Sequence, residues 1–273
     1  MVMAAMARTR NFYLIPYVAW IILFVAAPII LIAYYSFFDV EGNFTLKNYE
    51  KFFTPIYLRM TLYSFWYAFL ITAFSLLVAY PTALVLTKMK HKQLWLLLII
   101  LPSWINLLLK TYAFIGLFGK HGLVNAVFET IGIGNRQLLF NDFSFVFVSV
   151  YIFIPFMILP IYNSLEELNP ALIDASRDLG ASAWTTFRRV IVPLTLDGVK
   201  AGCQAVFIPS LSLFMITRLI AGNRVITLGT AIEQHFLVTQ DWGMGSTIAV
   251  FLILAMVIIM FATGIGKRGA LRG

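Results

Sequence analysis

Side chains that could catalyse a reaction or hold a metal ion are scattered along this sequence. The three histidines, His91, His121 and His235, form no His-Glu-x-x-His motif, and Cys203 is the only cysteine, so no intrachain disulfide and no clustered metal ligands are expected. The sequence also lacks the Gly-x-Ser-x-Gly turn of a serine nucleophile and the Gly-x-x-x-x-Gly-Lys-Ser/Thr loop that holds phosphates. We therefore expect no catalytic residue, no metal site and no cofactor bound by this chain.

The most informative polar segment covers residues 169–193. Asn169 followed by Pro170 is typical of a helix start, because Asn caps the first turn and proline fits the first helical position. Gly180 stands where a helix ends, and Ser182 is typical of the cap of a second helix that Pro193 stops. The pattern predicts two short helices joined by a glycine turn.

The elements around this segment follow from the distribution of charge. Of 273 residues, 61% are apolar and only 12% are charged, against roughly 25% charged in soluble domains. Six runs contain no charged residue, and each approaches or exceeds the about 20 residues that a membrane-spanning helix needs; they are residues 11–38, 60–87, 93–109, 143–165, 201–217 and 242–266.

This arrangement predicts an all-α membrane protein with a single domain over residues 1–273. Six spans are expected at about 12–38, 60–87, 93–116, 143–163, 196–218 and 244–265, and the polar segment at about 164–195 separates the fourth span from the fifth. The first run is longer than the about 7 to 15 apolar residues of a signal peptide, and Pro28 disrupts its Ala-Ala pair, so an uncleaved helix is expected.

Lys and Arg residues orient the spans. The side that holds both termini and the polar segment carries 12 basic and 5 acidic residues, and the other side carries 8 basic and 7 acidic residues. The positive-inside rule makes the first side cytoplasmic, and Lys88, Lys90 and Lys92 between two spans contribute most clearly. The net charge of +8 is then explained by basic residues that face the anionic surface of a lipid bilayer, and we expect no nucleic acid as a partner.

The polar segment resembles the signature of the permease subunits of ATP-binding-cassette (ABC) importers. That signature has an acidic residue, two small residues, a glycine four positions later and an Ile-x-Pro further on. These are Asp174, Ala175, Ser176, Gly180, Ile191 and Pro193 here. Asp174 replaces the commoner glutamate and Ser176 replaces alanine, and each keeps the charge sign or the size.

The resemblance implies a type I importer permease fold in a bacterial inner or plasma membrane, with a cytoplasmic coupling helix. The implied partners are a second, similar permease, a dimer of ATPase subunits that bind ATP and Mg, and an external or periplasmic substrate-binding protein. ATP hydrolysis would belong to the ATPase, so this chain would not be an enzyme. The residues implied in coupling are Asp174, Ala175, Ser176, Arg177, Asp178, Gly180 and Pro193. The competing interpretation is an ordinary amphipathic helix at the membrane surface.

Scattered stretches resemble the permeases of spermidine/putrescine importers over nearly the whole chain. They include residues 17–28, 43–55, 101–106, 155–157, 160–162, 177–182 and 241–242. A polyamine is an extended polycation and would favour aromatic faces, through cation–π attraction, and acidic groups at the outer end of its path. The candidate pathway residues are Tyr63, Trp66, Trp104, Asn106, Tyr112, Glu233 and Asp241.

Two alternatives stay open at this point. The first is an importer permease for another solute, such as ferric ion, sulfate, thiamine or a phosphonate. The second is a membrane scaffold or sensor that binds an ATPase without transporting.

Overall fold

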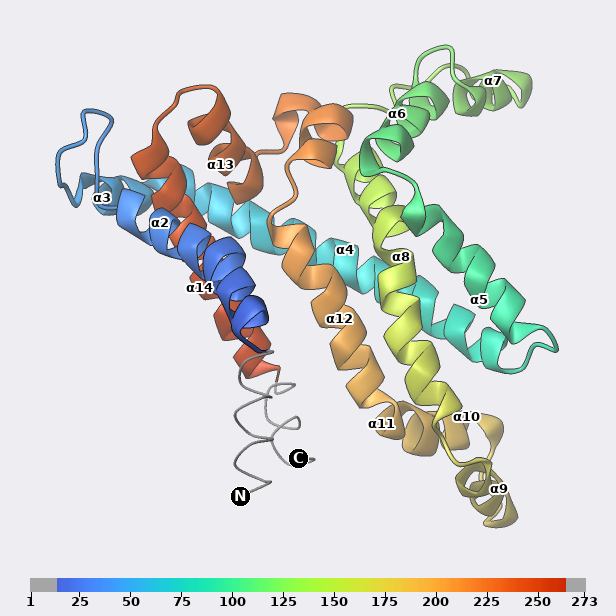
Figure 1. The fold of residues 1–273 in the computed structure, drawn as a ribbon. Coiled ribbons are helices and arrows are strands. Elements are labelled where there is room, and N and C mark those ends of the chain that lie inside the picture. Colours follow the sequence, from blue (N-terminus) through green and yellow to red (C-terminus); the bar gives the residue numbers. More distant parts are fainter. Residues whose placement is uncertain (1–13, 264–273) are drawn as a thin grey trace, which may run out of the picture. The chain divides into compact units, whose positions relative to one another are not determined.

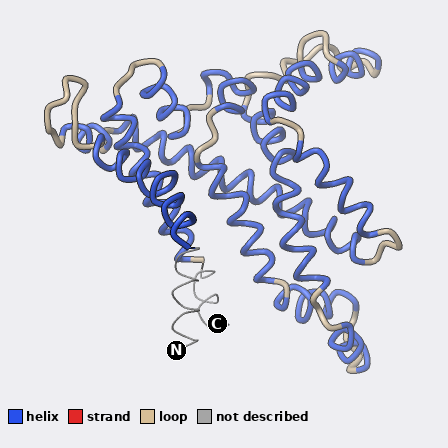
Figure 2. The backbone as a smooth tube through the Cα atoms, in the orientation of Figure 1, coloured by secondary structure: helices blue, strands red, loops and turns tan. Residues whose placement is uncertain are grey.

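The protein is almost entirely helical. The computed structural model describes residues 14–263, and Figure 2 shows that helices joined by loops make up this part of the chain, with no β-strand in it. The all-α fold class is therefore confirmed. Arg8, Arg10, Lys267, Arg268 and Arg272, which entered the topology prediction, lie outside the described residues.

Several helices of the described residues are long and apolar enough to cross a membrane. Four qualify alone: Leu14–Tyr35, Pro55–Thr87 (α4), Asp142–Glu166 (α8) and Trp242–Ala262 (α14). Two further pairs of helices qualify if each bent pair forms one span, which gives up to six. The first span widens into a π turn, η1 (Ile22–Ala26), before α2 (Ala27–Tyr35). Pro28 stands two residues after this turn and has no N–H to donate to the preceding turn.

The first bent pair contains the expected third span and extends beyond it. The second combines part of the expected polar segment with most of the expected fifth span. In the first pair, α5 (Lys92–Ile100) and the 3₁₀ turn η2 (Leu101–Trp104) meet α6 (Leu107–Phe118) and α7 (Leu123–Thr130) at 92°. In the second pair, α10 (Ala183–Thr186), the π turn η3 (Phe187–Ile191) and α11 (Val192–Leu194) meet α12 (Leu196–Leu211) at 63°. The expected span 93–116 is thus interrupted at residues 105–106, because Asn106 begins a new helix as its cap.

The fifth expected span also ends early. Helix α12 stops at Leu211, and the chain continues through η4 (Thr217–Ala221) and η5 (Gly222–Arg224) to α13 (Leu228–Leu237). The second short helix does not stop at Pro193 but continues one residue further, to Leu194. Pro193 follows the π turn η3 and stands one residue before this end.

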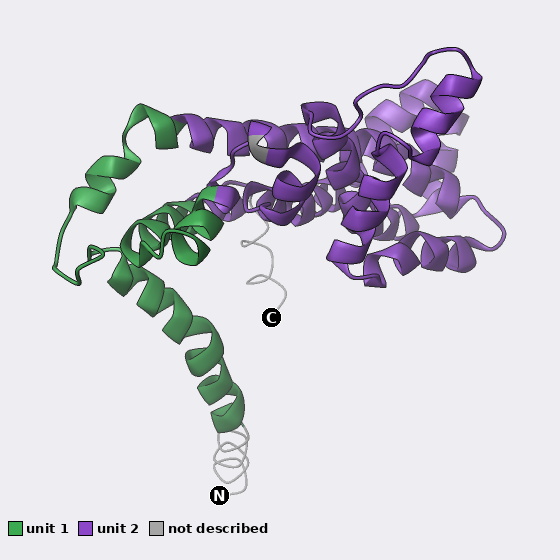
Figure 3. Ribbon diagram, turned by 90° about the horizontal axis from the view of Figure 1, so that it is seen from above, with its two compact units in different colours: residues 1–58, 231–254 green, residues 59–230, 255–273 purple. Residues whose placement is uncertain are grey.

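The chain divides into two compact units, which Figure 3 shows in different colours. The first unit comprises residues 1–58 and 231–254, with α2, α3 (Lys47–Phe52), most of α13 and the first part of α14. The second unit comprises residues 59–230 and 255–273, with most of α4 and the helices from α5 to α12. The single membrane domain expected from the sequence stays a prediction.

The core of the second unit forms where α8 packs against α12. Fully buried side chains of α8 include Val148, Met157 and Ile161. On α12, Gly198 and Gly202 are four residues apart and lie against α8. A Cβ at Gly198 would be 2.5 Å from the carbonyl oxygen of Pro160, and one at Gly202 would be 2.8 Å from Sδ of Met157. Small residues at this spacing allow two helix backbones to approach closely in a membrane.

Candidate functional site

The segment between α8 and α12 begins with a helix that is capped at both ends. In α9 (Pro170–Asp178), the side chain of Asn169 accepts the backbone N–H of Ala171 at 3.0 Å, and proline occupies the first turn. At the other end, Gly180 has φ +80°. Its N–H donates to the carbonyl of Arg177 at 2.8 Å, and the N–H of Ala181 donates to that of Ser176 at 3.1 Å. These two bonds form a Schellman motif, whose left-handed position favours glycine.

Helix α9 has no buried residue. Leu172 is 47% exposed and Leu179, just after the helix, is 88% exposed. Asp174 and Arg177 form an exposed ion pair at 3.7 Å along one face. Figure 1 shows α9 at one end of the second unit, beyond α10. A short helix with exposed leucines and a charged face is suited to bind another protein surface.

A hydroxyl pair joins α9 to the next helix. Oγ of Ser176 lies 3.0 Å from Oγ1 of Thr186, which is buried in α10. The side chain of Ser182 caps α10 by accepting the N–H of Thr185 at 3.2 Å. The hydroxyl of Ser176 therefore holds α9 against α10.

A second contact joins this helix pair to the spans. Thr195 is fully buried at the bend between α11 and α12, and its Oγ1 lies 2.9 Å from Oη of Tyr80 in α4. The ring of Tyr80 also meets that of Phe187 edge to face, with 5.8 Å between centroids. Lys92 of α5 forms an ion pair with Glu166 at the end of α8. A displacement of α9 can thus reach α4 and α12 through hydrogen-bonded and packed groups.

These contacts could not be predicted from the sequence. Tyr80 and Thr195 are 115 positions apart, and nothing in the local pattern of either residue predicts their partner. Pro193, expected to act in coupling, lies two residues before this contact within the bent region. Asp178 is exposed at the last position of α9.

The candidate pathway residues of the second unit are exposed on this chain. Trp104 is 72% exposed at the end of η2, and Tyr112, Tyr63 and Trp66 are also exposed. Asn106 accepts the backbone N–H of Leu108 at 2.8 Å and so caps α6. The structure brings none of these side chains together in a closed site within the described residues.

In the first unit, Asp241 has a local partner at each oxygen. Its Oδ1 accepts the N–H of Met244 at 3.0 Å and caps α14, and its Oδ2 lies 3.9 Å from Nδ1 of His235. The other ring nitrogen, Nε2, lies 2.9 Å from Oη of Tyr57. Burial lowers the pKa of His235, Asp241 opposes this shift, and Lys51 adds to it. Glu233 is half-buried in α13.

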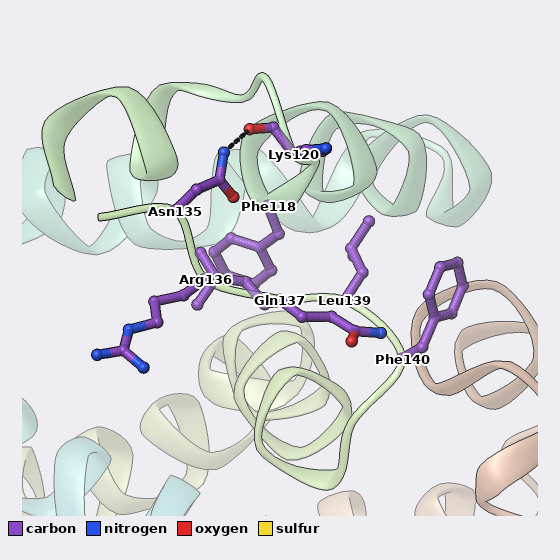
Figure 4. A pocket seen from close by; sticks show the side chains of 8 residues that line it. Phe118, Lys120, Asn135, Arg136, Gln137, Leu139 and Phe140 are labelled. Carbon is purple, nitrogen blue, oxygen red and sulfur yellow. Dashed lines mark hydrogen bonds between the residues drawn. The ribbon is translucent and has the colours of Figure 1, made fainter. Parts of the chain in front are cut away.

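An unexpected cavity of about 420 Å³ lies in the second unit after α6. Phe118 and Leu139 line it together with Lys120 and Arg136. Figure 4 shows Asn135 bonded to the backbone of Lys120, at 2.7 Å, and the side chain of Arg136 directed away from Lys120. None of the candidate pathway residues lines this cavity.

These observations define a multi-pass α-helical membrane protein with an exposed, capped helix between two of its spans. The chain belongs to the family described as binding-protein-dependent transport system inner membrane component, whose model matches residues 74–269. This finding confirms the prediction of a transport permease. The matched region contains the polar segment, the last four expected spans and the second half of the expected second span.

Curated relatives cover nearly the whole chain. The spermidine/putrescine transport system permease protein PotB of Haemophilus influenzae is 34% identical over 253 residues, which cover 89% of this chain and 88% of the relative. PotB of Escherichia coli K12 is 35% identical over 249 residues, which cover 88% and 90%. The resemblance to this branch of the family is therefore confirmed.

The fold matches solved transporters at much lower sequence identity. A chain of a bacterial alginate ABC transporter, in complex with an alginate pentasaccharide-bound periplasmic protein, superposes with a TM-score of 0.76. The match covers 97% of this chain and 96% of that chain at 17% identity. This likeness confirms the expected ABC importer permease fold.

Proposed function

We propose that this chain is a permease subunit of an ABC importer that takes up polyamines, with spermidine or putrescine as substrate. The observation that carries the proposal is the identity of 34% and 35% to permeases named for spermidine/putrescine transport, over 89% and 88% of the chain. A second, similar permease would complete the pathway, and an external binding protein would deliver the substrate. Both termini would be cytoplasmic, in a bacterial inner or plasma membrane.

In this proposal, α9 binds a partner ATPase that holds ATP and Mg. Asp174 and Arg177 offer charge, and Ala175 and Ser176 offer close approach. The Schellman turn at Gly180 fixes the direction of the helix, so that a push on α9 becomes a movement of α10 rather than a local bend. The contact between Ser176 and Thr186, at 3.0 Å, and the contact between Tyr80 and Thr195, at 2.9 Å, transmit that movement to the spans.

The exposed aromatic side chains would complete the pathway only in the pair of permeases. Tyr63, Trp66, Trp104 and Tyr112 present ring faces that a desolvated ammonium group favours. Asn106 would add a polar group beside them. Glu233 and Asp241 would add acidic groups at the outer end.

ATP-driven uptake in proteoliposomes tests this function. The liposomes would contain this chain, its genomically neighbouring permease and ATPase, and labelled spermidine or putrescine, with and without the neighbouring binding protein. Uptake that needs both ATP and the binding protein is the expected result. ATPase activity stimulated by the binding protein without polyamine uptake would refute the polyamine assignment and leave a permease for another solute. ATPase binding with no stimulation by any cargo would favour the scaffold alternative.

A further inference from the structure

A pocket in the first unit is lined by none of the residues expected to act in coupling or in the substrate pathway. It has a volume of about 430 Å³ and lies between the end of α2, the turn that follows it and the start of α14. Such a volume is within the range of small-molecule sites, about 300 to 1,000 Å³. Four aromatic side chains line it, namely Tyr34, Tyr35, Phe38 and Trp242, together with Asp39, Val40, Gly42, Gln240 and Gly243. We refer to it as the aromatic pocket.

The rings of the aromatic pocket are packed against one another. Tyr34 and Phe38 have centroids 4.6 Å apart, and Tyr35 and Trp242 have centroids 6.0 Å apart. Tyr34 and Tyr35 meet edge to face at 5.7 Å. Rings in mutual contact present π faces that attract a cation.

Asp39 supplies the only charged side chain in this lining. Its Oδ1 accepts the N–H groups of Glu41 at 3.0 Å and of Asn43 at 2.8 Å. The backbone N–H of Asn43 is the largest cause that lowers the pKa of Asp39, so the carboxylate stays ionised at neutral pH. Lys47 and Lys51, the basic residues of the following helix, do not line the pocket. The lining is therefore acidic and aromatic.

The walls of the aromatic pocket are also held in place. A Cβ at Gly243 would lie 1.9 Å from the carbonyl oxygen of Phe38, so the start of α14 and the turn after α2 touch directly. The carbonyl oxygen of Phe38 also accepts a hydrogen bond from Nδ2 of the buried Asn48, at 2.8 Å. Gln240 has φ +54°, a strained value for a residue other than glycine, and such strain is concentrated at binding sites.

A carboxylate offsets the positive end of the α14 helix dipole beside the pocket. The pocket touches the first residues of α14, where the partial positive charge of the dipole lies. Asp241 accepts the N–H of Met244 at 3.0 Å and so offsets that charge with a carboxylate.

We propose that the aromatic pocket binds an alkylammonium group, with the four rings around the cation and Asp39 as its counter-ion. The pocket lies where the first span ends, so two sources carry this group to it: a free polyamine, and the ethanolamine headgroup of a phospholipid. The polyamine source rests on the proposed function. The lipid source does not.

Equilibrium binding of labelled spermidine tests the proposal. The complex of this chain with its partner permease and ATPase would be placed in nanodiscs of phosphatidylglycerol alone, without binding protein or ATP. W242L removes one ring and D39N removes the charge while keeping an acceptor oxygen. The matched controls are W20L, at an equally exposed tryptophan of the first span, and E41Q, at the neighbouring acid of the same turn, because neither residue lines the pocket.

W242L and D39N should each weaken spermidine binding about fivefold, which corresponds to a partly exposed contact of about 1 kcal/mol. W20L and E41Q should bind as the wild type does. If the phosphatidylethanolamine headgroup also binds in the pocket, it should compete with spermidine. Nanodiscs that contain this lipid should then show weaker spermidine binding by the wild type and unchanged binding by D39N. Mass spectrometry should then find less retained phosphatidylethanolamine on D39N than on E41Q.

Wild-type spermidine binding and lipid retention in both W242L and D39N would overturn the proposal. Uptake assays separate this failure from that of the proposed function. Polyamine uptake by the wild type, with unchanged binding in the variants, refutes the pocket alone. No polyamine uptake, with reduced phosphatidylethanolamine retention in D39N, refutes the proposed function and supports the pocket.

Discussion

The close packing of α8 against α12 gives a sharp test of the structure through Gly198→Ala. The added methyl group would lie 2.4 Å from Oγ of Ser164 and 2.5 Å from the carbonyl oxygen of Pro160. The hydroxyl of Ser164 can rotate away, but Cβ of Ser164, at 2.7 Å, and the carbonyl of Pro160 move only with the backbone of α8. An ordinary contact begins at 3.4 Å, so relief by helix separation needs a shift of about 0.9 Å, the difference between 3.4 and 2.5 Å.

The cost of this shift follows from overpacking in well-filled cores, which is about 1 to 3 kcal/mol. Alanine also favours a helix over glycine by about 0.5 to 1 kcal/mol, and this gain partly hides the cost. Gly116→Ala isolates the gain, because Gly116 lies in α6 and a Cβ there has nothing within 4 Å. The difference in unfolding free energy between the two variants is therefore the packing term, about 1 to 3 kcal/mol.

Unfolding of the purified chain in mixed micelles with increasing denaturing detergent measures this difference. G116A should be at least as stable as the wild type, and G198A should be less stable than G116A by the packing term. Tryptophan fluorescence would follow both transitions under identical conditions. Equal stability of G198A and G116A would refute the close approach of the two helices at this point.

The remaining predictions concern coupling and pH. Gly180→Val should lower uptake per ATP hydrolysed while the complex still assembles, because a non-glycine residue in the left-handed backbone conformation costs about 1–2 kcal/mol. As a control, Gly132→Val, at the same φ of +80°, should leave this ratio unchanged. Tyr80→Phe removes the contact with Thr195 and should also lower the ratio of uptake to ATPase activity without lowering assembly. Burial lowers the pKa of His235 in the folded chain, so the unfolded chain binds more protons. The contribution of His235 to stability is therefore complete above about pH 6.5 and falls as the pH drops below that value. His235→Gln should flatten this dependence between about pH 7 and 5 in thermal unfolding.

Local chemistry explains which features could be predicted from the sequence. The caps of α9 depend on neighbours within a few residues: Asn169 accepts from Ala171, and Gly180 forms the turn with Ala181. Membrane spans depend on composition over about 20 residues. Both signals are contained in a short stretch of sequence, so no knowledge of the fold is needed to find them.

Contacts between distant residues could not be predicted in this way. The bond between Tyr80 and Thr195 depends on how α4 meets the bend before α12. The interruption at Asn106 replaces one expected span with two helices, because a cap side chain and Pro102 together outweigh the apolar run around them. The spacing of Gly198 and Gly202 was visible in the sequence, but its partner helix was not.

The exposed leucines of α9 carry a different meaning from the exposed apolar side chains of the spans. An apolar side chain on a span faces lipid, where its exposure costs nothing. Leu172 and Leu179 are exposed but lie outside the helices that qualify as spans, so contact with lipid along a span does not account for their exposure. Burying one leucine is worth about 1.5–3 kcal/mol. Under the proposed function, these two side chains therefore contribute affinity for the ATPase, while Asp174 and Arg177 beside them set the orientation in which it binds.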